Sequence, residues 1–301
     1  MTKTLRSQRD RDIMHCSFIL IKYEGAIITY FHPFILHTSV VAMGSPKGGG
    51  QGGGSVRTFI YNGSSWEPYG TAMAEGTGDA TGYSVSIGGA GSTMAVGSPK
   101  ASNNAGKVAV YFMGNSGDWE LLGQEVYGEA GGDTDGTSVG ISDDGRVLVV
   151  GGKGHKGLDT ISGEVDAKLV GYCRIYKLQN DDWELQHSIV GKKTGEKLGS
   201  SCDVSSDGNL VACGGLGGLY GDSGASGVVQ LYNMATFETS TLWPRGESSA
   251  IAGAAFGSSV ALSADGGRII AGAPTWSGSS VNGEGGGGPF VGAIQVFQRG
   301  G

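Results

Sequence analysis

The sequence is poor in charge, in histidine and in helical patterns. Only 16% of its 301 residues are charged, five are histidine, and an excess of acidic residues leaves a net charge of −7. No Lys- or Arg-rich run lies outside the extreme N-terminus, whereas binding to nucleic-acid phosphates needs a basic surface. Heptads and long amphipathic helical stretches are also missing. These absences argue against a nucleic-acid partner, and the composition is that of an all-β protein.

A long uninterrupted apolar run is missing too. Residues 17–43 are apolar but are broken by Lys22, Glu24 and His32, while a membrane-spanning helix needs roughly 20 mostly uninterrupted apolar residues. A signal peptide has basic residues before an apolar run of about 7–15 residues, and "GAIITYFHPFIL" fits this pattern only loosely. We therefore expect no membrane span. Residues 1–38 form an atypical segment, which is either a degenerate signal or anchor, or a set of strands that complete the fold.

Glycine, in contrast, is abundant, with 59 residues, and its arrangement decides between disorder and repetition. Four stretches share one pattern: "TGYSVSIGGAGSTMAVGSP", "DGTSVGISDDGRVLVVGGK", "LGSSCDVSSDGNLVACGGL" and "AFGSSVALSADGGRIIAGAP". In each copy an opening glycine is followed 15 residues later by a closing glycine, and the pairs are Gly82 with Gly97, Gly136 with Gly151, Gly199 with Gly214 and Gly257 with Gly272. A partial fifth copy, "VVAMGSPK", surrounds Gly44. Because the repeats start 54, 63 and 58 residues apart, disorder is rejected for residues 40–301.

Each copy is predicted to be a β-hairpin. Asp-Gly at 144–145, 207–208 and 265–266 suits a two-residue turn whose central residues have positive φ. A turn centred there gives the opposed pairs Val139 with Val150, Ile141 with Leu148, Cys202 with Cys213, Val204 with Val211, Val260 with Ala271 and Leu262 with Ile269. One face of the hairpin is therefore apolar and the other carries small residues, which suits sheets that pack face to face.

Two further strands follow the hairpin. The third ends in an aromatic residue in "KVAVYF", "YCRIYK", "VVQLYN" and "AIQVFQ", and the fourth often opens on a tryptophan, at Trp66, Trp119 and Trp183. Four antiparallel strands in each unit of about 50–60 residues are typical of a β-propeller blade. We predict an all-β fold over residues 39–301: a β-propeller of about five four-stranded blades, either complete or part of a larger propeller. The residues expected to be buried between blades are Val139, Ile141, Val260 and Leu262, with Tyr111, Tyr176, Tyr232 and Phe297 of the third strands.

The repeat resembles a known family. "FG" at 256–257 and "GAP" at 272–274 look like the FG-GAP repeat of the integrin α-chain propeller and of many surface proteins. The other copies have Thr81, Asp135 and Leu198 at the position of the phenylalanine, so the chain is similar to a divergent member. The resemblance implies a non-enzymatic module that binds a protein or carbohydrate ligand, outside the cell or at its surface.

Candidate binding residues lie on one face of the predicted propeller. The loop between the second and third strands varies from 9 residues (97 to 106) to 20 residues (151 to 171), and binding residues concentrate on variable loops. The candidates on that face are Trp276, Tyr220, His155, Trp243, Asp133 and Asp135. Asp133 shares its register with Asp79 and Glu196, so these acids form either an acidic ring or a series of turn caps, and their recurrence favours caps.

The four cysteines show no metal-ligand spacing. Cys202 and Cys213 face each other in the predicted hairpin, which would allow a cross-strand disulfide. In a hydrogen-bonded pair, however, the Cα atoms lie about 5.5 Å apart and the side chains are wider apart than at the alternate site. Small apolar residues stand at the equivalent positions of the other copies, for Cys173 as well. We therefore predict buried free thiols.

Catalysis and metal binding have little support in the sequence. A propeller glycosidase needs paired carboxylates near the channel, and the innermost strands offer only Asp203. The hairpin turns are too short and hold too few carboxylates for a calcium shell. We expect no catalytic residue, no metal and no cofactor. The alternatives to a binding module are a glycoside hydrolase-like enzyme of the propeller kind and a cytoplasmic interaction scaffold.

The two ends of the predicted propeller are incomplete. The first copy lacks an opening half, and the last copy has no strand after its third. An open propeller would expose a strand edge. We expect "AIITYF" or its neighbours to supply the inner strand of the first blade and "SFILIKY" the outer strand of the last, which closes the ring. The competing view is that the chain is part of a larger propeller.

Overall fold

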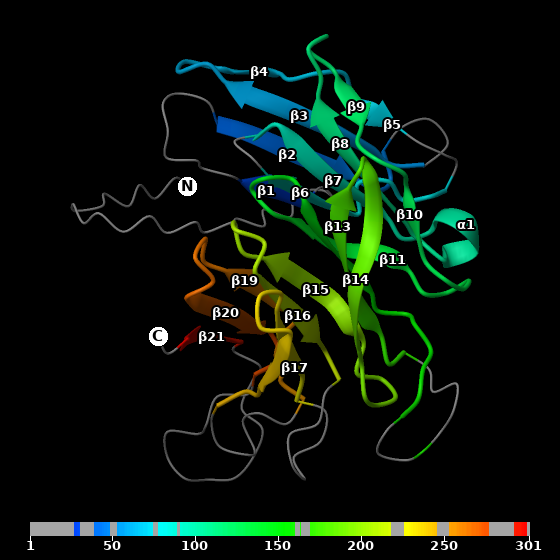
Figure 1. Cartoon of the computed structure of the whole chain (residues 1–301), viewed down its shortest axis with the longest axis vertical. Coiled ribbons are helices and arrows are strands. Elements are labelled where there is room, and N and C mark those ends of the chain that lie inside the picture. The colour runs from blue at the N-terminus through cyan, green and yellow to red at the C-terminus, as the bar shows by residue number, and fades with distance from the viewer. Residues whose placement is uncertain are drawn as a thin grey trace, which may run out of the picture.

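Antiparallel β-strands make up almost all of the regular structure (Figure 1). The computed structural model describes residues 27–30, 39–48, 53–74, 78–88, 91–159, 163, 169–217, 226–245, 253–276 and 292–299. Within these ranges the strands form five sheets, and the one helix, α1 (Ala101–Asn104), is a single turn. The predicted all-β class is therefore confirmed. In the same part of the chain, no helix is long and apolar enough to cross a membrane.

Each sheet is built from one sequence repeat, with its strands in chain order except for the last strand of the first and second sheets. The first contains β1 (Ile27–Tyr30), β2 (Ser39–Ser45), β3 (Ser55–Tyr61), β4 (Trp66–Pro68) and β5 (Met73–Ala74), and the second β6 (Ser84–Gly88), β7 (Thr93–Ser98), β8 (Lys107–Met113), β9 (Trp119–Leu121) and β10 (Val126–Tyr127). The third contains β11 (Asp135–Ile141), β12 (Val147–Gly152), β13 (Tyr172–Gln179) and β14 (Asp182–Val190), and the fourth β15 (Leu198–Val204), β16 (Leu210–Gly215), β17 (Val228–Asn233) and β18 (Glu238–Leu242). The fifth contains β19 (Ser259–Leu262), β20 (Arg268–Ala273) and β21 (Ala293–Gln298). The exceptions to chain order are β5, which pairs with β3, and β10, which pairs with β8.

The predicted hairpin register is confirmed in all three Asp-Gly repeats. Val139 pairs with Val150, and the pairs at the equivalent positions are Cys202 with Cys213 and Val260 with Ala271. The predicted turn conformation is wrong, because only the glycine of each Asp-Gly pair has a positive φ (68° at Gly145). The aspartate acts through its side chain instead. Oδ1 of Asp144 accepts hydrogen bonds from the Ser142 hydroxyl at 2.6 Å and from the Arg146 N–H at 3.0 Å.

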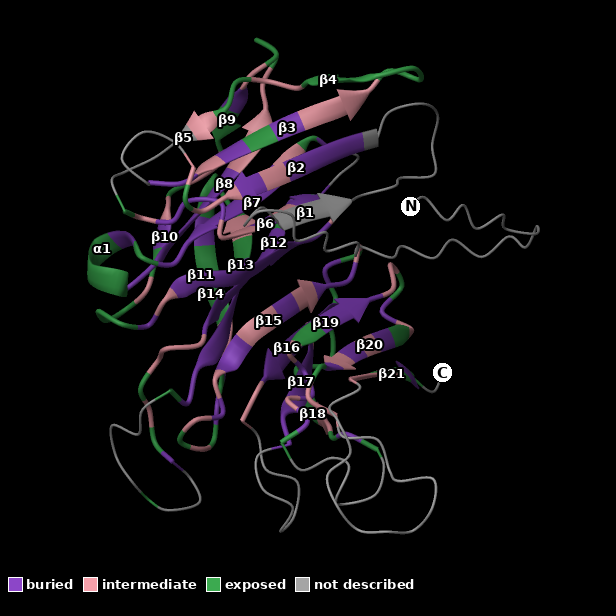
Figure 2. Cartoon of the chain, turned by 180° about the vertical axis from the view of Figure 1, so that it is seen from behind, coloured by how far each residue is buried: buried purple, intermediate pink, exposed green. Residues whose placement is uncertain are grey.

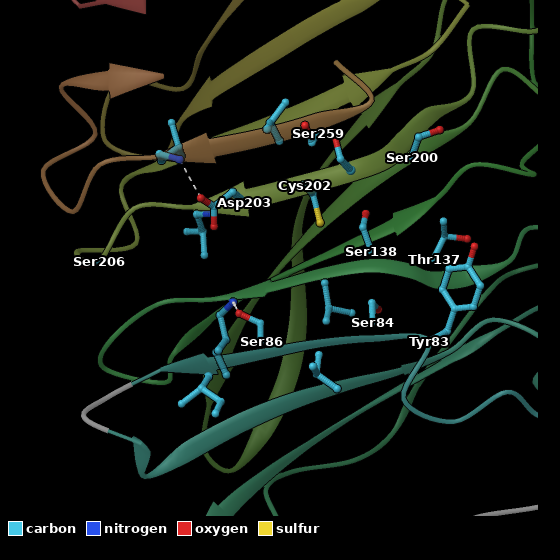
Figure 3. Close-up of a pocket in the computed structure, with 18 of the residues that line it drawn as sticks. Tyr83, Ser84, Ser86, Thr137, Ser138, Ser200, Cys202, Asp203, Ser206 and Ser259 are labelled. Atoms are coloured by element: carbon cyan, nitrogen blue, oxygen red, sulfur yellow. Dashed lines mark hydrogen bonds between the residues drawn. The ribbon is translucent and has the colours of Figure 1, made fainter. Parts of the chain in front are cut away.

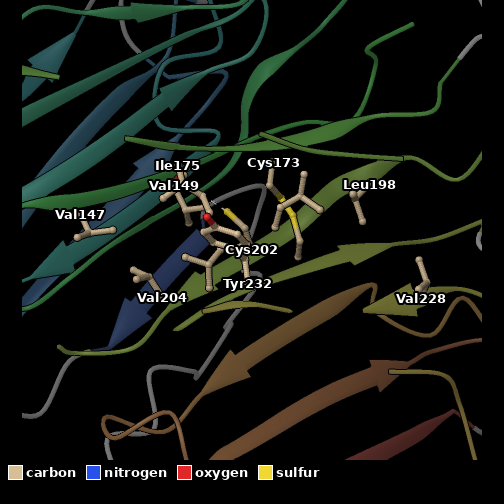
Figure 4. Close-up of a cluster of buried hydrophobic side chains, with 12 residues drawn as sticks. Val147, Val149, Cys173, Ile175, Leu198, Cys202, Val204, Val228 and Tyr232 are labelled. Carbon is tan, nitrogen blue, oxygen red and sulfur yellow. Dashed lines mark hydrogen bonds between the residues drawn. A yellow bond between two sulfur atoms is a disulfide. The ribbon is translucent and has the colours of Figure 1, made fainter. Parts of the chain in front are cut away.

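The core lies between consecutive sheets. We call the side of a sheet that meets the following sheet its front face, and the side that meets the preceding sheet its back face. Between the third and fourth sheets, for example, Val149 and Ile175 of the third pack against Cys202 and Tyr232 of the fourth (Figure 4). The residues predicted to be buried are at most 7% exposed, with the exception of Tyr111, which is half-buried; they are Val139, Ile141, Tyr176, Tyr232, Val260, Leu262 and Phe297.

The periodic glycines mark the points where neighbouring sheets touch. A Cβ atom on the closing glycine of one repeat would overlap the carbonyl oxygen of the opening glycine of the next, as at Gly151 against Gly199. The carbonyl oxygen of Gly199 also accepts a hydrogen bond from the Ser138 hydroxyl of the preceding repeat at 2.9 Å. Ser138 lies two residues after the opening glycine of its repeat. The same bond joins Ser84 to Gly136 and Ser201 to Gly257. The spacing of the glycines therefore reflects close backbone approach between sheets.

A disulfide also joins two sheets, which corrects the prediction of free thiols. Cys173 of β13 is bonded to Cys213 of β16, with their Cα atoms 6.4 Å apart, and Cys202 is a buried free thiol (Figure 4). Cys202 does lie opposite Cys213 in the hairpin, as predicted. The partner of Cys213 comes from the front face of the preceding sheet, because face-to-face packing brings those two side chains together.

The five sheets form an open arc, with the first and fifth sheets at its two ends (Figures 1 and 2). β1 pairs with β2, so Ile27–Tyr30 of "AIITYF" supply the inner strand of the first sheet as predicted. "SFILIKY" lies outside the described residues. Among the described strands, none of the first sheet pairs with one of the fifth.

Candidate functional site

Each repeat inserts one side chain into a closed slot between sheets. The residue before the opening glycine forms a parallel bridge with the glycine that precedes the third strand of the preceding repeat. The residue before it has a positive φ in all four copies, between 53° and 61°, at Ala80, Thr134, Lys197 and Ala255. The slot residues Thr81, Asp135, Leu198 and Phe256 are at most 1% exposed. The third repeat is thus unusual, because its slot holds a carboxylate.

Asp135 meets two side chains of β13 in this slot. The Tyr172 hydroxyl donates a hydrogen bond to Oδ1, and Nη1 of Arg174 lies 3.8 Å from Oδ2. The Arg174 guanidinium stacks over the Tyr172 ring, 4.3 Å from its centroid, and its Nη2 lies 2.7 Å from Oε1 of Glu129. Burial raises the pKa of Asp135 to about 7, although the Tyr172 hydrogen bond and the Arg174 charge lower it.

Asp133 and His155 extend the same group toward the surface. Nδ1 of His155 lies 3.1 Å from Oδ1 of Asp133, and the Tyr172 hydroxyl lies 3.4 Å from Oδ2. The His155 and Tyr172 rings pack with their centroids 4.4 Å apart. We call Asp133, Asp135, His155, Tyr172 and Arg174 the Asp–His–Tyr cluster. The structure therefore brings together three of the six candidate residues named from the sequence.

Tyr172 and Arg174, which hold the cluster together, were not among the candidates predicted from the sequence. Their equivalents are Lys107 and Ala109 in the second repeat and Val228 and Gln230 in the fourth. Read along the strand, "YCRIYK" places Tyr172, Arg174 and Tyr176 on one face, which is the back face of β13. The sequence did contain a signal for this contact. Arg174 lies on a strand face that is otherwise buried, two residues from Tyr172, and in the same repeat as the slot residue Asp135.

Solvent reaches the cluster at two points only. The Asp133 and Asp135 side chains are 4% and 0% exposed, whereas the His155 side chain is 20% exposed and that of Glu129 is 66% exposed. His155 follows β12 on the variable loop, and Asp133 lies on the connection that enters β11. The cluster thus presents the His155 imidazole at the face from which the variable loops leave, and the exposed Glu129 carboxylate covers its Arg174.

Two of the three acids that share a register act as turn caps. Oδ2 of Asp133 accepts a hydrogen bond from the Ala130 N–H at 2.9 Å, and Oε2 of Glu196 accepts one from the Lys192 N–H at 2.7 Å. Both acids are buried, and Asp79 is half-buried. The capping interpretation is confirmed for Asp133 and Glu196. Among the described residues, no group of three or more His, Cys, Asp or Glu side chains is arranged to hold a metal ion.

A cavity of about 280 Å³ lies on the inner strands β6, β11, β15 and β19 (Figure 3). Its walls are rich in hydroxyl groups, from Ser84, Ser86, Thr137, Ser138, Ser200, Ser201, Ser258 and Ser259. Two carboxylates also line it, Asp203 and Asp143, and the sequence analysis identified only the first. Asp143 lies in the turn after β11, beside the Asp-Gly pair, where the sequence indicated only a turn.

Asp203 connects two sheets at the cavity wall. Its Oδ2 accepts a hydrogen bond from the Leu262 N–H of β19 at 2.7 Å, and its Oδ1 accepts one from the Val204 N–H at 2.9 Å (Figure 3). Burial raises the pKa of Asp203 to about 7, while these two hydrogen bonds oppose the shift. The cavity therefore offers hydroxyl groups and a carboxyl group that is partly protonated at neutral pH, a lining that suits a polyhydroxy ligand.

Of the three remaining candidates, Trp276 and Trp243 are not part of either site. Trp276 packs against the buried cluster that contains Phe256. Trp243 follows β18 and is 37% exposed. Tyr220 lies outside the described residues.

Comparison with known proteins finds no family model and no curated protein that matches the sequence.

Proposed function

We propose that the five sheets are consecutive blades of an FG-GAP-type β-propeller, and that the protein is a non-enzymatic module that binds a protein or carbohydrate ligand. Three features support the propeller. Each repeat makes one antiparallel sheet, each sheet packs face to face on the next, and the three inner strands have the same order in all five sheets. The phenylalanine of "FG" at 256–257 fills the slot between the fourth and fifth sheets.

The Asp–His–Tyr cluster is the observation that carries the binding proposal. A side chain from a variable loop, His155, lies against Asp133 from the connection between two sheets. The buried partners Tyr172 and Arg174 hold the two acids in place, so little conformational entropy would be lost when a ligand binds at this point. The partly exposed imidazole of His155 can hydrogen-bond to sugar hydroxyls or to a polar protein surface, while the buried Asp133 carboxylate holds its other face.

The disulfide supports the proposed location outside the cell or at its surface. Disulfides persist in oxidising compartments and are rare in the cytosol, where thiols are kept reduced. Cys173 and Cys213 join two sheets within the core rather than at a flexible terminus. The cytoplasmic scaffold instead requires both thiols to be reduced. Alkylation and mass measurement of protein taken from its source cells distinguish the two.

A glycan and protein array tests the binding function. We expect His155→Ala to weaken binding to the array ligand by about tenfold or more, which corresponds to about 1.4 kcal/mol. His155→Gln should retain part of the affinity, because its amide can still donate to Asp133. The matched control is Glu184→Ala, an exposed acid on β14. Binding that is unaffected by both His155 variants would contradict the assignment to this cluster.

A glycoside hydrolase-like activity is the second candidate. Asp143 and Asp203 both line the cavity, and such an enzyme needs two carboxyl groups at its site. The raised pKa of Asp203 suits a general acid at neutral pH. Hydrolysis of chromogenic glycosides that is abolished by Asp203→Asn and by Asp143→Asn would establish the enzyme and would move the function from the loop face to the cavity.

A further inference from the structure

One position on the front face can be compared in all five sheets. It is the strand-three residue that pairs with the closing glycine, occupied by Val56, Val108, Cys173, Val229 and Ile294. The first four side chains are 0% exposed, whereas Ile294 is 74% exposed. The same residue position is therefore core in four sheets and surface in the fifth.

A second position shows the same contrast. The residue two positions later is at most 5% exposed in the first four sheets, as Thr58, Val110, Ile175 and Leu231, and Val296 of the fifth is 59% exposed. Ile270, which pairs with Val296 on the neighbouring strand, is only half-buried. We call Ile270, Ile294 and Val296 the front patch. Adjacent branched apolar side chains that remain in water mark a surface that a partner covers.

The four internal interfaces show what covers such a patch. The strand-three residue packs with the residue that precedes the closing glycine on the back face of the following sheet. These pairs are Val56 with Val96, Val108 with Val150, Cys173 with Cys213 and Val229 with Ala271, and each pair belongs to one buried cluster. The disulfide shows that the two positions are in direct contact. A front face of this type is thus complementary to the back face of another repeat.

The first sheet has a back face of the required type. Met43 precedes its closing glycine, as Cys213 does in the fourth sheet, and Phe59 is at the position of Tyr232. Both side chains remain partly exposed. This first sheet stands at the opposite end of the arc from the front patch, and the three intervening sheets hold it there (Figures 1 and 2). A first sheet that reaches the front patch therefore belongs to another molecule.

We propose that the front patch of the fifth sheet docks onto the back face of the first sheet of a second copy of this chain. The contact is head-to-tail, so it uses two different surfaces of each molecule, and it repeats the register of the four internal interfaces. Interfaces of this kind generate rings or filaments. The inference goes beyond the proposed ligand binding, because it uses the ends of the arc and not the loop face.

Sedimentation of the purified chain over a range of concentrations tests the association. The wild type is expected to form larger species as concentration increases. Ile294→Lys and Val296→Lys place a charge in the contact and should weaken association by about tenfold or more. Since both side chains are exposed, these variants are expected to keep the wild-type melting temperature. The matched control is Leu185→Lys, which replaces a side chain that is 49% exposed on β14 and should associate like the wild type. A wild type that stays monomeric at all concentrations overturns the proposal.

Disulfide trapping identifies the surface on the second copy. The native Cys173–Cys213 pair corresponds to Ile294 of one copy and Met43 of the other, so Ile294→Cys protein mixed with differently tagged Met43→Cys protein should form a mixed disulfide dimer on oxidation. Both proteins carry Cys16→Ser to remove a background thiol. Gln295→Cys replaces Ile294→Cys in the control, because this neighbour points to the opposite face of β21 and should give no dimer. Association without this crosslink overturns the proposal. A double variant that crosslinks only within one chain also overturns it, in favour of ring closure.

Discussion

At the scale of single residues, the slot residue before each opening glycine is either an apolar core side chain or a polar group in a hydrogen-bond network. Phe256 and Leu198 fill it with apolar carbon, whereas Asp135 places a carboxylate there that is 0% exposed. A buried carboxylate is costly unless it is paired. In this protein the Tyr172 hydroxyl donates to Oδ1, but the Arg174 guanidinium lies 3.8 Å from Oδ2, which accepts no hydrogen bond. The third repeat has therefore exchanged hydrophobic packing for a polar network that pairs the carboxyl group only in part.

The pH dependence of stability should report the Asp135 carboxyl. Its pKa is raised from its ordinary value to about 7, so between about pH 4 and pH 7 the folded protein retains a proton that the unfolded chain has lost. The free energy of unfolding therefore falls as pH rises through this window. We expect Asp135→Asn to reduce this fall when urea unfolding is measured at pH 5 and at pH 8.

The control for this measurement is Asp118→Asn. The backbone N–H of Thr71 donates to Asp118 and holds its pKa below the ordinary value. Its contribution to stability is present above that ordinary value and is lost as the solution becomes more acidic. Asp118→Asn should thus leave the change between pH 5 and pH 8 as in the wild type. An unchanged slope in Asp135→Asn would show that this carboxyl is ionised throughout the range.

Two closing glycines provide a second test at this scale. A Cβ atom on Gly214 would overlap the carbonyl oxygen of Gly257 in the next sheet, whereas the nearest atom to one on Gly272 is the mobile hydroxyl of Ser259. Neither glycine has a positive φ. We expect Gly214→Ala to lower the free energy of unfolding by about 1–3 kcal/mol, and Gly272→Ala to have a smaller effect. Equal losses in chemical denaturation would show that sheet contact is not the reason for the glycine.

At the scale of strands and sheets, the repeat predicted pairing within a sheet correctly. Val139 opposite Val150 and Leu262 opposite Ile269 followed from the alternation of the side chains around one turn. Contacts between sheets were not predictable in the same way. Cys202 and Cys213 do oppose each other, yet Cys213 is bonded to Cys173, because its side chain points out of the hairpin toward the preceding sheet. Such a partner depends on how two sheets are stacked.

The disulfide between β13 and β16 should contribute measurably to stability. It closes a loop between residues 40 positions apart, and a disulfide typically contributes about 2–4 kcal/mol by restricting the unfolded chain. A reducing agent is therefore expected to lower the melting temperature of the wild type. In a Cys173→Val, Cys213→Val variant, whose valines match Val108 and Val150 of the preceding interface, the agent should have no effect. Three free thiols per molecule among Cys173, Cys202 and Cys213 in the non-reduced protein would contradict the assignment.

At the scale of the whole molecule, the arc places similar repeats in unequal surroundings. The three middle sheets are covered on both faces, whereas the first and fifth stand at the ends (Figure 2). The inner strand β1 comes from the atypical N-terminal segment, so this segment contributes to the fold at least through residues 27–30.

Two deletions separate the contribution of β1 from that of the residues before it. Removing residues 1–30 deletes β1 and leaves the hydrogen-bonding edge of β2 unpaired, so we expect a lower melting temperature than in the wild type. Removing residues 1–24 keeps β1 and serves as the comparison. If "SFILIKY" closes the ring as the outer strand of the fifth sheet, the shorter deletion also lowers the melting temperature. A longer deletion that melts like the shorter one would contradict a stabilising role for β1.

The sequence by itself determined the repeat, the strand order and the register within each hairpin, because these follow from local alternation and from glycines at a constant spacing of 15 residues. It also singled out Asp133, Asp135 and His155. Only the tertiary structure decided that Tyr172 and Arg174 join them, that Cys213 bonds to Cys173, and that Ile294 is exposed while Val229 is core. The physical reason is that neighbours across a face depend on the stacking of whole sheets, which no single repeat encodes.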